Sequence, residues 1–175
     1  MTWLLVAVIV VLLCVIGVLL YRQRRSAQLR EGFGPEYDRV VEERGSQRAG
    51  EAELRERFDR RRSYAIRPLE PAARERYAER WRATQAQFVD RPASALADAD
   101  TLVAEVMRER GYPVEDFDQQ AADVSVDHPG VVEHYRKAHA VHGTREASTE
   151  ELRQALVHYR ALFDELLEPE PQEVK

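Results

Sequence analysis

The sequence predicts an all-α protein with an N-terminal transmembrane helix, a charged helical stalk and a small helical bundle. Nineteen consecutive residues, Thr2 to Leu20, carry no charge. After that run, apolar residues recur at three- and four-residue spacing, which is typical of helices. No stretch alternates apolar and polar residues as a strand would. We therefore expect an anchor, a stalk, a bundle domain and a disordered tail, at residues 1–21, 22–64, 65–167 and 168–175.

The predicted anchor has the length of a bilayer core. Trp3 and Tyr21 bracket the uncharged run, and a helix would separate them by roughly 27 Å. A cleaved signal peptide would need a basic start, a shorter apolar stretch and small residues at the cut site, and these are absent. Cys14 is the single cysteine, so no intrachain disulfide or thiolate metal site is expected.

Basic residues flank the predicted span on one side only. They are Arg22, Arg24, Arg25 and Arg30. Since basic flanks favour the cytoplasmic side, we expect a single-pass plasma-membrane protein with its C-terminal domain in the cytoplasm. The alternative is an extracytoplasmic domain behind an uncleaved signal. The same four arginines are candidates for contact with anionic lipid.

Charge divides the rest of the chain into a basic and an acidic part. Residues 22–64 hold twelve arginines and nine acids, whereas residues 65–175 hold fourteen bases and twenty-two acids. The chain has twenty-four arginines, two lysines and no asparagine, which indicates a GC-rich bacterial genome, such as that of an actinobacterium. One modest domain plus a connector fits the roughly 150 residues beyond the span.

Glycine and proline punctuate the predicted stalk. Gly34 and Pro35 should end the anchor helix and begin a short one, which Gly45 then ends. The next segment, residues 51–64, has too few apolar residues for a core helix, so we expect its side chains to be solvated. Its arginine cluster has two interpretations, a solvated surface or a site for nucleic acid, anionic lipid or an acidic protein. Interleaved acids at four-residue spacing favour the solvated surface and argue against nucleic acid.

Helical signals organise the predicted bundle. We expect a helix ending near Phe88 with Trp81 in the core, and another from Pro92 to Gly111. A shorter helix should contain the apolar residues Phe117, Ala121 and Val124. Asp127 is predicted to cap the helix after that, and Ser148 with Glu151 should form a capping box at the start of the last one.

Part of the bundle has a recognisable pattern. It comprises Trp81, Gln85, Phe88-Val89-Asp90, Pro92, Ala99-Asp100, Leu102, Val106-Met107 and Arg110-Gly111-Tyr112-Pro113. Together with Phe33-Gly34-Pro35-Glu36-Tyr37-Asp38, His128-Pro129 and Tyr135-Arg136, this pattern resembles a family of uncharacterised bacterial proteins, many of them actinobacterial, often labelled membrane or secreted proteins. The resemblance covers most of the chain and implies no activity or catalytic residue.

The sequence contains no strong candidate for a metal site or a catalytic site. His128, His134, His139 and His142 fall within fifteen residues, yet they lack the spacing of a zinc or di-iron motif. Ser125 with Asp123, Asp127 and His128 is too local in sequence for a catalytic triad, and we expect capping roles there. We predict no enzyme, no cofactor, no metal and no catalytic residue.

The sequence favours a membrane-tethered interaction or scaffold module with a protein partner. The main alternative is a small-ligand or metal-binding bundle, enzymatic or not, built around Tyr135, His139 and His142. A structural element of the envelope is a third interpretation, which an extracytoplasmic domain would favour.

Overall fold

The computed structural model describes residues 2–144 and 146–168, without the side chains of residues 2, 4–8, 10 and 11. Over these residues the chain forms helices and no strand, which confirms the all-α prediction. The helices are α1 (Thr2–Phe33), α2 (Pro35–Glu43), α3 (Gln47–Arg62), α4 (Pro71–Gln87), α5 (Pro92–Arg110), α6 (Phe117–Asp127), α7 (Val132–His142) and α8 (Thr149–Leu167). The predicted tail lies outside the described residues, apart from Glu168.

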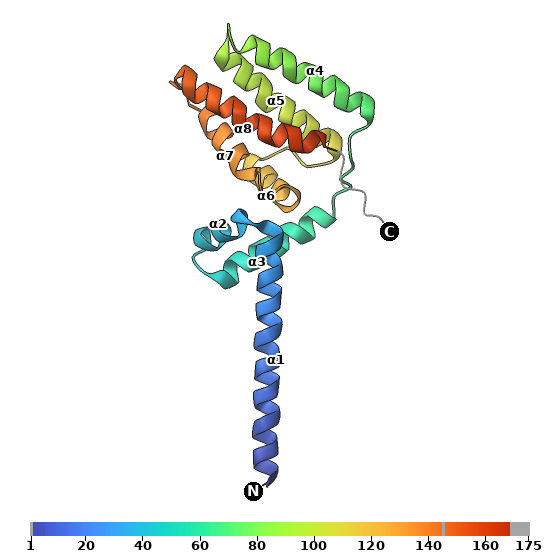
Figure 1. The fold of residues 1–175 in the computed structure, drawn as a ribbon, viewed down its shortest axis with the longest axis vertical. Coiled ribbons are helices and arrows are strands. Elements are labelled where there is room, and N and C mark those ends of the chain that lie inside the picture. Colours follow the sequence, from blue (N-terminus) through green and yellow to red (C-terminus); the bar gives the residue numbers. More distant parts are fainter. Residues whose placement is uncertain (1, 145, 169–175) are drawn as a thin grey trace. The chain divides into compact units, whose positions relative to one another are not determined.

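The chain divides into two compact units, Met1–Leu54 and Arg55–Lys175. The division falls inside α3, whereas the sequence places the start of the bundle at residue 65. The first unit contains α1, α2 and the first half of α3. The second unit contains the rest of α3 and the five helices that follow it (Figure 1).

In the first unit, glycines allow the turns that the sequence predicts. Gly34 and Gly45 adopt positive φ angles of 47° and 71°, so the helices on either side of each can end and restart. Gly50 of α3 lies against α2, because an added Cβ would stand 2.7 Å from the Val41 Cα. The Tyr37 hydroxyl donates to the buried Glu51 and so links α2 to α3, while Gln47 donates to the same carboxylate within α3.

The membrane span was predicted for residues 1–21, and this range falls partly on residues outside the description. Over the part of the chain that is described, no helix combines the length and the apolarity needed to cross a membrane. The span is therefore not confirmed by the structure.

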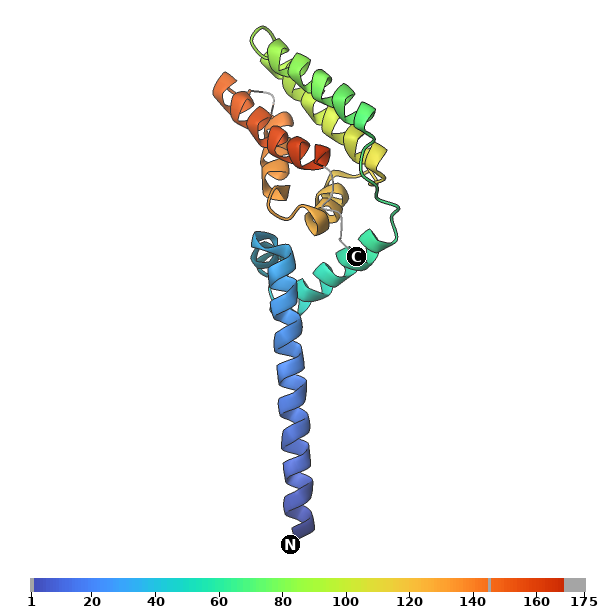
Figure 2. The same ribbon diagram turned by 45° about the vertical axis from the view of Figure 1, so that its right-hand side comes forward.

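In the second unit, α5 packs between α4 and α8, and α7 packs on α8 (Figure 1 and Figure 2). The core consists of apolar side chains from all of these helices, with further residues from α6 and the segment before α4. Trp81 is 4% exposed and stacks on Phe163 of α8, with ring centroids 4.5 Å apart. The core position predicted for Trp81 is confirmed, because aromatic rings at helical spacing here face a neighbouring helix.

Helix ends in this unit follow most of the predicted signals. Gly111 ends α5 with φ 102°, and Ser148 with Glu151 forms the capping box of α8. The N-cap predicted at Asp127 is wrong. Asp127 is the last residue of α6, and α7 begins after a turn, with Val131 at its N-cap. Pro129 therefore lies in the turn between the two helices.

Candidate functional site

A polar cluster joins α5, α7 and α8 around the Asp100 carboxylate. The Tyr159 hydroxyl donates to Asp100 Oδ1 over 2.6 Å, and His139 Nδ1 lies 3.4 Å from the same oxygen. The His139 ring stacks on Phe117 with centroids 3.6 Å apart and planes 9° apart. One face of the His139 imidazole therefore packs on an aromatic ring, and its Nδ1 atom points toward a carboxylate.

Burial sets the protonation of the tyrosines in this cluster. Burial, followed by the hydrogen bond to Asp100, raises the pKa of Tyr159 well above its ordinary value. Burial and the charge of Asp100 likewise raise the pKa of Tyr135, whose hydroxyl donates to Gln120 Oε1 over 2.8 Å. Both phenols are therefore hydrogen-bond donors at physiological pH, and neither is a base.

This geometry limits the chemistry that the cluster can perform. A carboxylate facing Nδ1 favours the tautomer with a proton there, which leaves Nε2 as the acceptor or metal-ligating atom. The His142 ring is 6.2 Å from the His139 ring. The structure thus brings His139 and His142 near one another, but among the described residues no three His, Cys, Asp or Glu side chains are grouped to hold a metal ion.

His134 and His158 form a second contact, which the sequence analysis missed. Their Nδ1 atoms are 2.8 Å apart and join α7 to α8. His134 is five residues before His139, so helical spacing places the two side chains on different faces of α7. The signal that was overlooked is His158, which is in the last helix and adjacent to the core residue Tyr159.

A third polar cluster corrects the prediction of a solvated stalk over residues 51–64. Asp123 of α6 is fully buried and accepts hydrogen bonds from Arg60 Nε and the Tyr64 hydroxyl, each over 3.1 Å. Arg57 is also buried, and its Nη1 lies 3.4 Å from Ser125 Oγ. Burial and Asp123 raise the pKa of Tyr64. The prediction holds for exposed side chains such as Glu56, Phe58 and Arg62. It is wrong for the face that carries Leu54 and Arg57, which are buried, because it did not anticipate partners for the polar residues.

The residues considered for a catalytic triad have separate partners. Asp127 accepts from Arg61 and from the Tyr112 hydroxyl, so it is part of the α3–α6 contact. The Ser125 hydroxyl donates to the Ala122 carbonyl over 2.6 Å within α6. His128 Nδ1 lies 3.2 Å from Glu165 Oε2 on α8. The expected capping role of Ser125 is not seen, and these side chains form no nucleophile and base pair.

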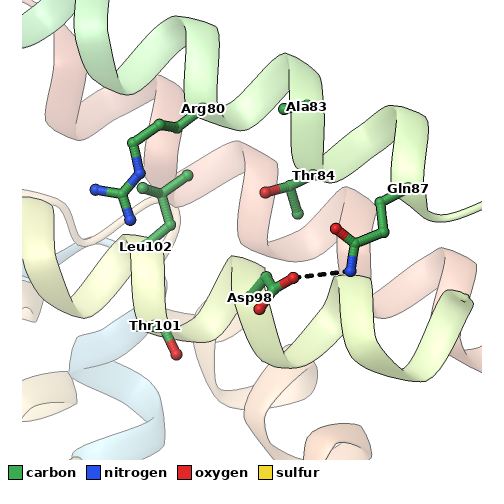
Figure 3. Close-up of a pocket in the computed structure, with 7 residues that line it drawn as sticks. All are labelled: Arg80, Ala83, Thr84, Gln87, Asp98, Thr101 and Leu102. Atoms are coloured by element: carbon green, nitrogen blue, oxygen red, sulfur yellow. Dashed lines mark hydrogen bonds between the residues drawn. The ribbon is translucent and has the colours of Figure 1, made fainter.

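An open depression of about 260 Å³ lies between α4 and α5 (Figure 3). Gln87 Nε2 donates to Asp98 Oδ2 across it over 2.9 Å. Arg80, on another wall, pairs with Glu105. Because the polar side chains that line the depression already pair with one another or with a neighbouring residue, the depression is a weak candidate for a ligand site.

The residues expected to meet lipid lie on α1. Arg30 Nη2 is 2.6 Å from Asp38 Oδ1, and its guanidinium stands over the Tyr37 ring. Arg25 stands over the Tyr21 ring. Arg30 therefore already has an acidic partner on α2, and this pairing makes it a weaker candidate for contact with anionic lipid.

Comparisons with known proteins add no assignment. No protein-family model, curated protein or solved structure matches this chain.

Proposed function

We propose that the protein is a membrane-tethered interaction or scaffold module. The observation that carries this proposal is the exposure of apolar side chains along α1. Those from Leu12 to Tyr21 are described, and the large ones are 49% to 63% exposed. Ten successive positions cover every side of a helix, since each turn takes about 3.6 residues. A helix that is apolar all round needs an apolar environment, and the uncharged run from Thr2 to Leu20 has the length of a bilayer core.

The proposed orientation rests on the positive charge that follows this segment. Arg22, Arg24 and Arg25 come directly after the apolar run. Basic flanks remain on the cytoplasmic side, so the tether would hold the helical bundle at the cytoplasmic face of the plasma membrane. The lipid contact is then electrostatic and depends on salt.

The way the bundle uses its polar groups supports the proposed role in protein contact. Asp100, Asp123 and Asp127 all have partners from neighbouring helices, so they stabilise the fold and are engaged before any substrate arrives. The bundle is acidic over residues 65–175. We propose that its outer surface binds a protein partner and that the tether concentrates this partner at the membrane.

Crosslinking in the native membrane tests this proposal. We expect the full chain to capture a reproducible set of membrane-associated proteins in crosslinked pull-downs. A variant without residues 2–21 should lose this set while retaining a folded bundle by circular dichroism. A matched control replaces Arg76 by Gln, which changes exposed charge on α4 and leaves the tether intact. An identical partner set with and without residues 2–21 would contradict tethering.

The second candidate function is binding of a small ligand or metal ion. It is favoured by one observation, the Asp100 carboxylate facing Nδ1 of His139. This arrangement orients an imidazole toward a ligand at Nε2, and His142 stands nearby. Zn²⁺ should then raise the melting temperature of the full chain, and His139→Ala should abolish the rise. A His134→Ala control should retain it, since His134 contacts His158 instead.

A further inference from the structure

The contact between His134 and His158 has an unusual chemical constraint. The Nδ1 atoms are 2.8 Å apart, and the ring centroids are 4.9 Å apart. Two imidazole nitrogens at this distance form a hydrogen bond only when one donates and the other accepts. One proton therefore lies between them. If both rings are protonated to the cation, two Nδ1–H donors and two positive charges face each other, and the contact is repulsive.

The surroundings of this pair do not offset that repulsion. Among the described residues, neither ring has an ion pair with a carboxylate, and the charges that act on His158 come from His134 and Lys137 of α7. Lys137 Nζ is 3.8 Å from Glu133, on the same helix. Two titratable groups on or next to α5 and α6 that contact α7 or α8 have partners other than this pair. Asp100 contacts Tyr159 and His139, while His128, directly after α6, contacts Glu165.

We infer that the His134–His158 contact is a proton-sensitive latch, which holds α7 on α8 while the pair shares one proton and weakens when both rings are protonated. His134 lies on α7 and His158 on α8, and these two helices pack against each other in the bundle. The latch is independent of the proposed tether, because it needs only the two helices. It gives the bundle surface formed by α7 and α8 a dependence on pH in the range where histidine titrates.

The electrostatics of His158 agree with this inference. Burial, then His134, then Lys137 lower the pKa of His158 below its ordinary value of 6.5. In the unfolded chain this imidazole regains its ordinary pKa and binds a proton first as the pH falls. The contribution of the latch to stability is therefore complete above pH 6.5 and declines as the pH falls below that value.

Thermal unfolding of the full chain in detergent micelles tests the latch. We would record circular dichroism at pH 7.5 and pH 5.0 for the wild type, for His158→Gln and for the control His142→Gln. Between pH 7.5 and pH 5.0, the melting temperature should fall further in the wild type and in the control than in His158→Gln. The difference between these falls should be about 2 °C or more. Equal losses in all three proteins would overturn the inference.

A second measurement does not depend on how well the variant folds. Imidazole NMR signals of the wild-type chain should show His158 titrating below the ordinary range for histidine. His134→Gln should move that titration upward, because it removes the neighbouring positive charge, whereas His142→Gln should not. A His158 titration at its ordinary value, or one that His134→Gln leaves unchanged, would show that the pair is a packing contact without proton sensitivity.

Discussion

The buried Asp123 gives the sharpest test of how the bundle begins. A fragment of residues 55–175 retains Arg60 and Tyr64 as donors to this carboxylate. A fragment of residues 65–175 lacks the cation and the phenol and keeps Gln119, whose Nε2 donates to Asp123 Oδ1 over 2.9 Å. Removing the partner of a buried charge costs about 3 to 5 kcal/mol. The free energy of unfolding of a small domain is about 5 to 15 kcal/mol, so the shorter fragment should lose a large part of its stability. Loss of the more exposed Arg61–Asp127 pair adds about 1 kcal/mol or less.

Asp123→Asn separates this reasoning from a general effect of truncation. In residues 55–175 the substitution removes a paired charge and should destabilise the fragment. In residues 65–175 the carboxylate has already lost its ion pair with Arg60 and keeps Gln119 as a donor, so the substitution should change the free energy of unfolding much less. Urea unfolding followed by circular dichroism at pH 7 measures both effects. The control is Asp164→Asn at an exposed position, which should change the free energy of unfolding by no more than about 0.5 kcal/mol. Equal midpoints for the two unsubstituted fragments would restore the solvated stalk and refute the reasoning.

Three further predictions concern separate parts of the chain. Trp81→Ala should cost about 3 to 5 kcal/mol in urea unfolding, because it empties the space against Phe163. Trp81→Phe should cost much less, since it keeps a ring and removes a buried indole N–H that has no partner among the described residues; equal losses would contradict this. The Arg153 guanidinium lowers the pKa of Glu150 to about 2, so its small contribution to stability should be present above about pH 4.5 and be lost as the pH falls toward 2. In an NMR titration, Arg153→Gln should return that pKa toward 4.5, and an unchanged value would rule out the pairing. A phosphatase fused after Lys175 should be inactive if the bundle is cytoplasmic, and strong activity would place it outside.

The sequence was informative where one local signal decides the structure. Gly111 ends α5 because a left-handed residue is needed there, and the capping box at Ser148 depends on residues three apart. Trp81 was placed in the core by spacing alone. Such signals act over a few residues, so they can be read without knowledge of the tertiary structure.

The errors arose where distant polar residues meet. Nothing in the sequence near Arg60 indicates that its partner is Asp123, sixty-three residues later. Asp127 has the composition of an N-cap, yet a tyrosine and an arginine from other segments use its carboxylate. The facing of His134 and His158 likewise depends on how α7 packs on α8. Pairings of this kind require the tertiary fold, because charge and spacing do not specify the partner.

Alkaline carbonate extraction of cell membranes tests the proposed tether most directly. The full chain should remain in the membrane pellet, since a spanning helix resists removal of peripheral charge contacts. A variant with Leu12, Leu13 and Ile16 changed to Glu should move to the supernatant, because charged residues are costly inside a bilayer. The matched control, with Arg22, Arg24 and Arg25 changed to Gln, should stay in the pellet. Release of the unsubstituted chain by carbonate would contradict a spanning anchor and remove the basis for the tethered module.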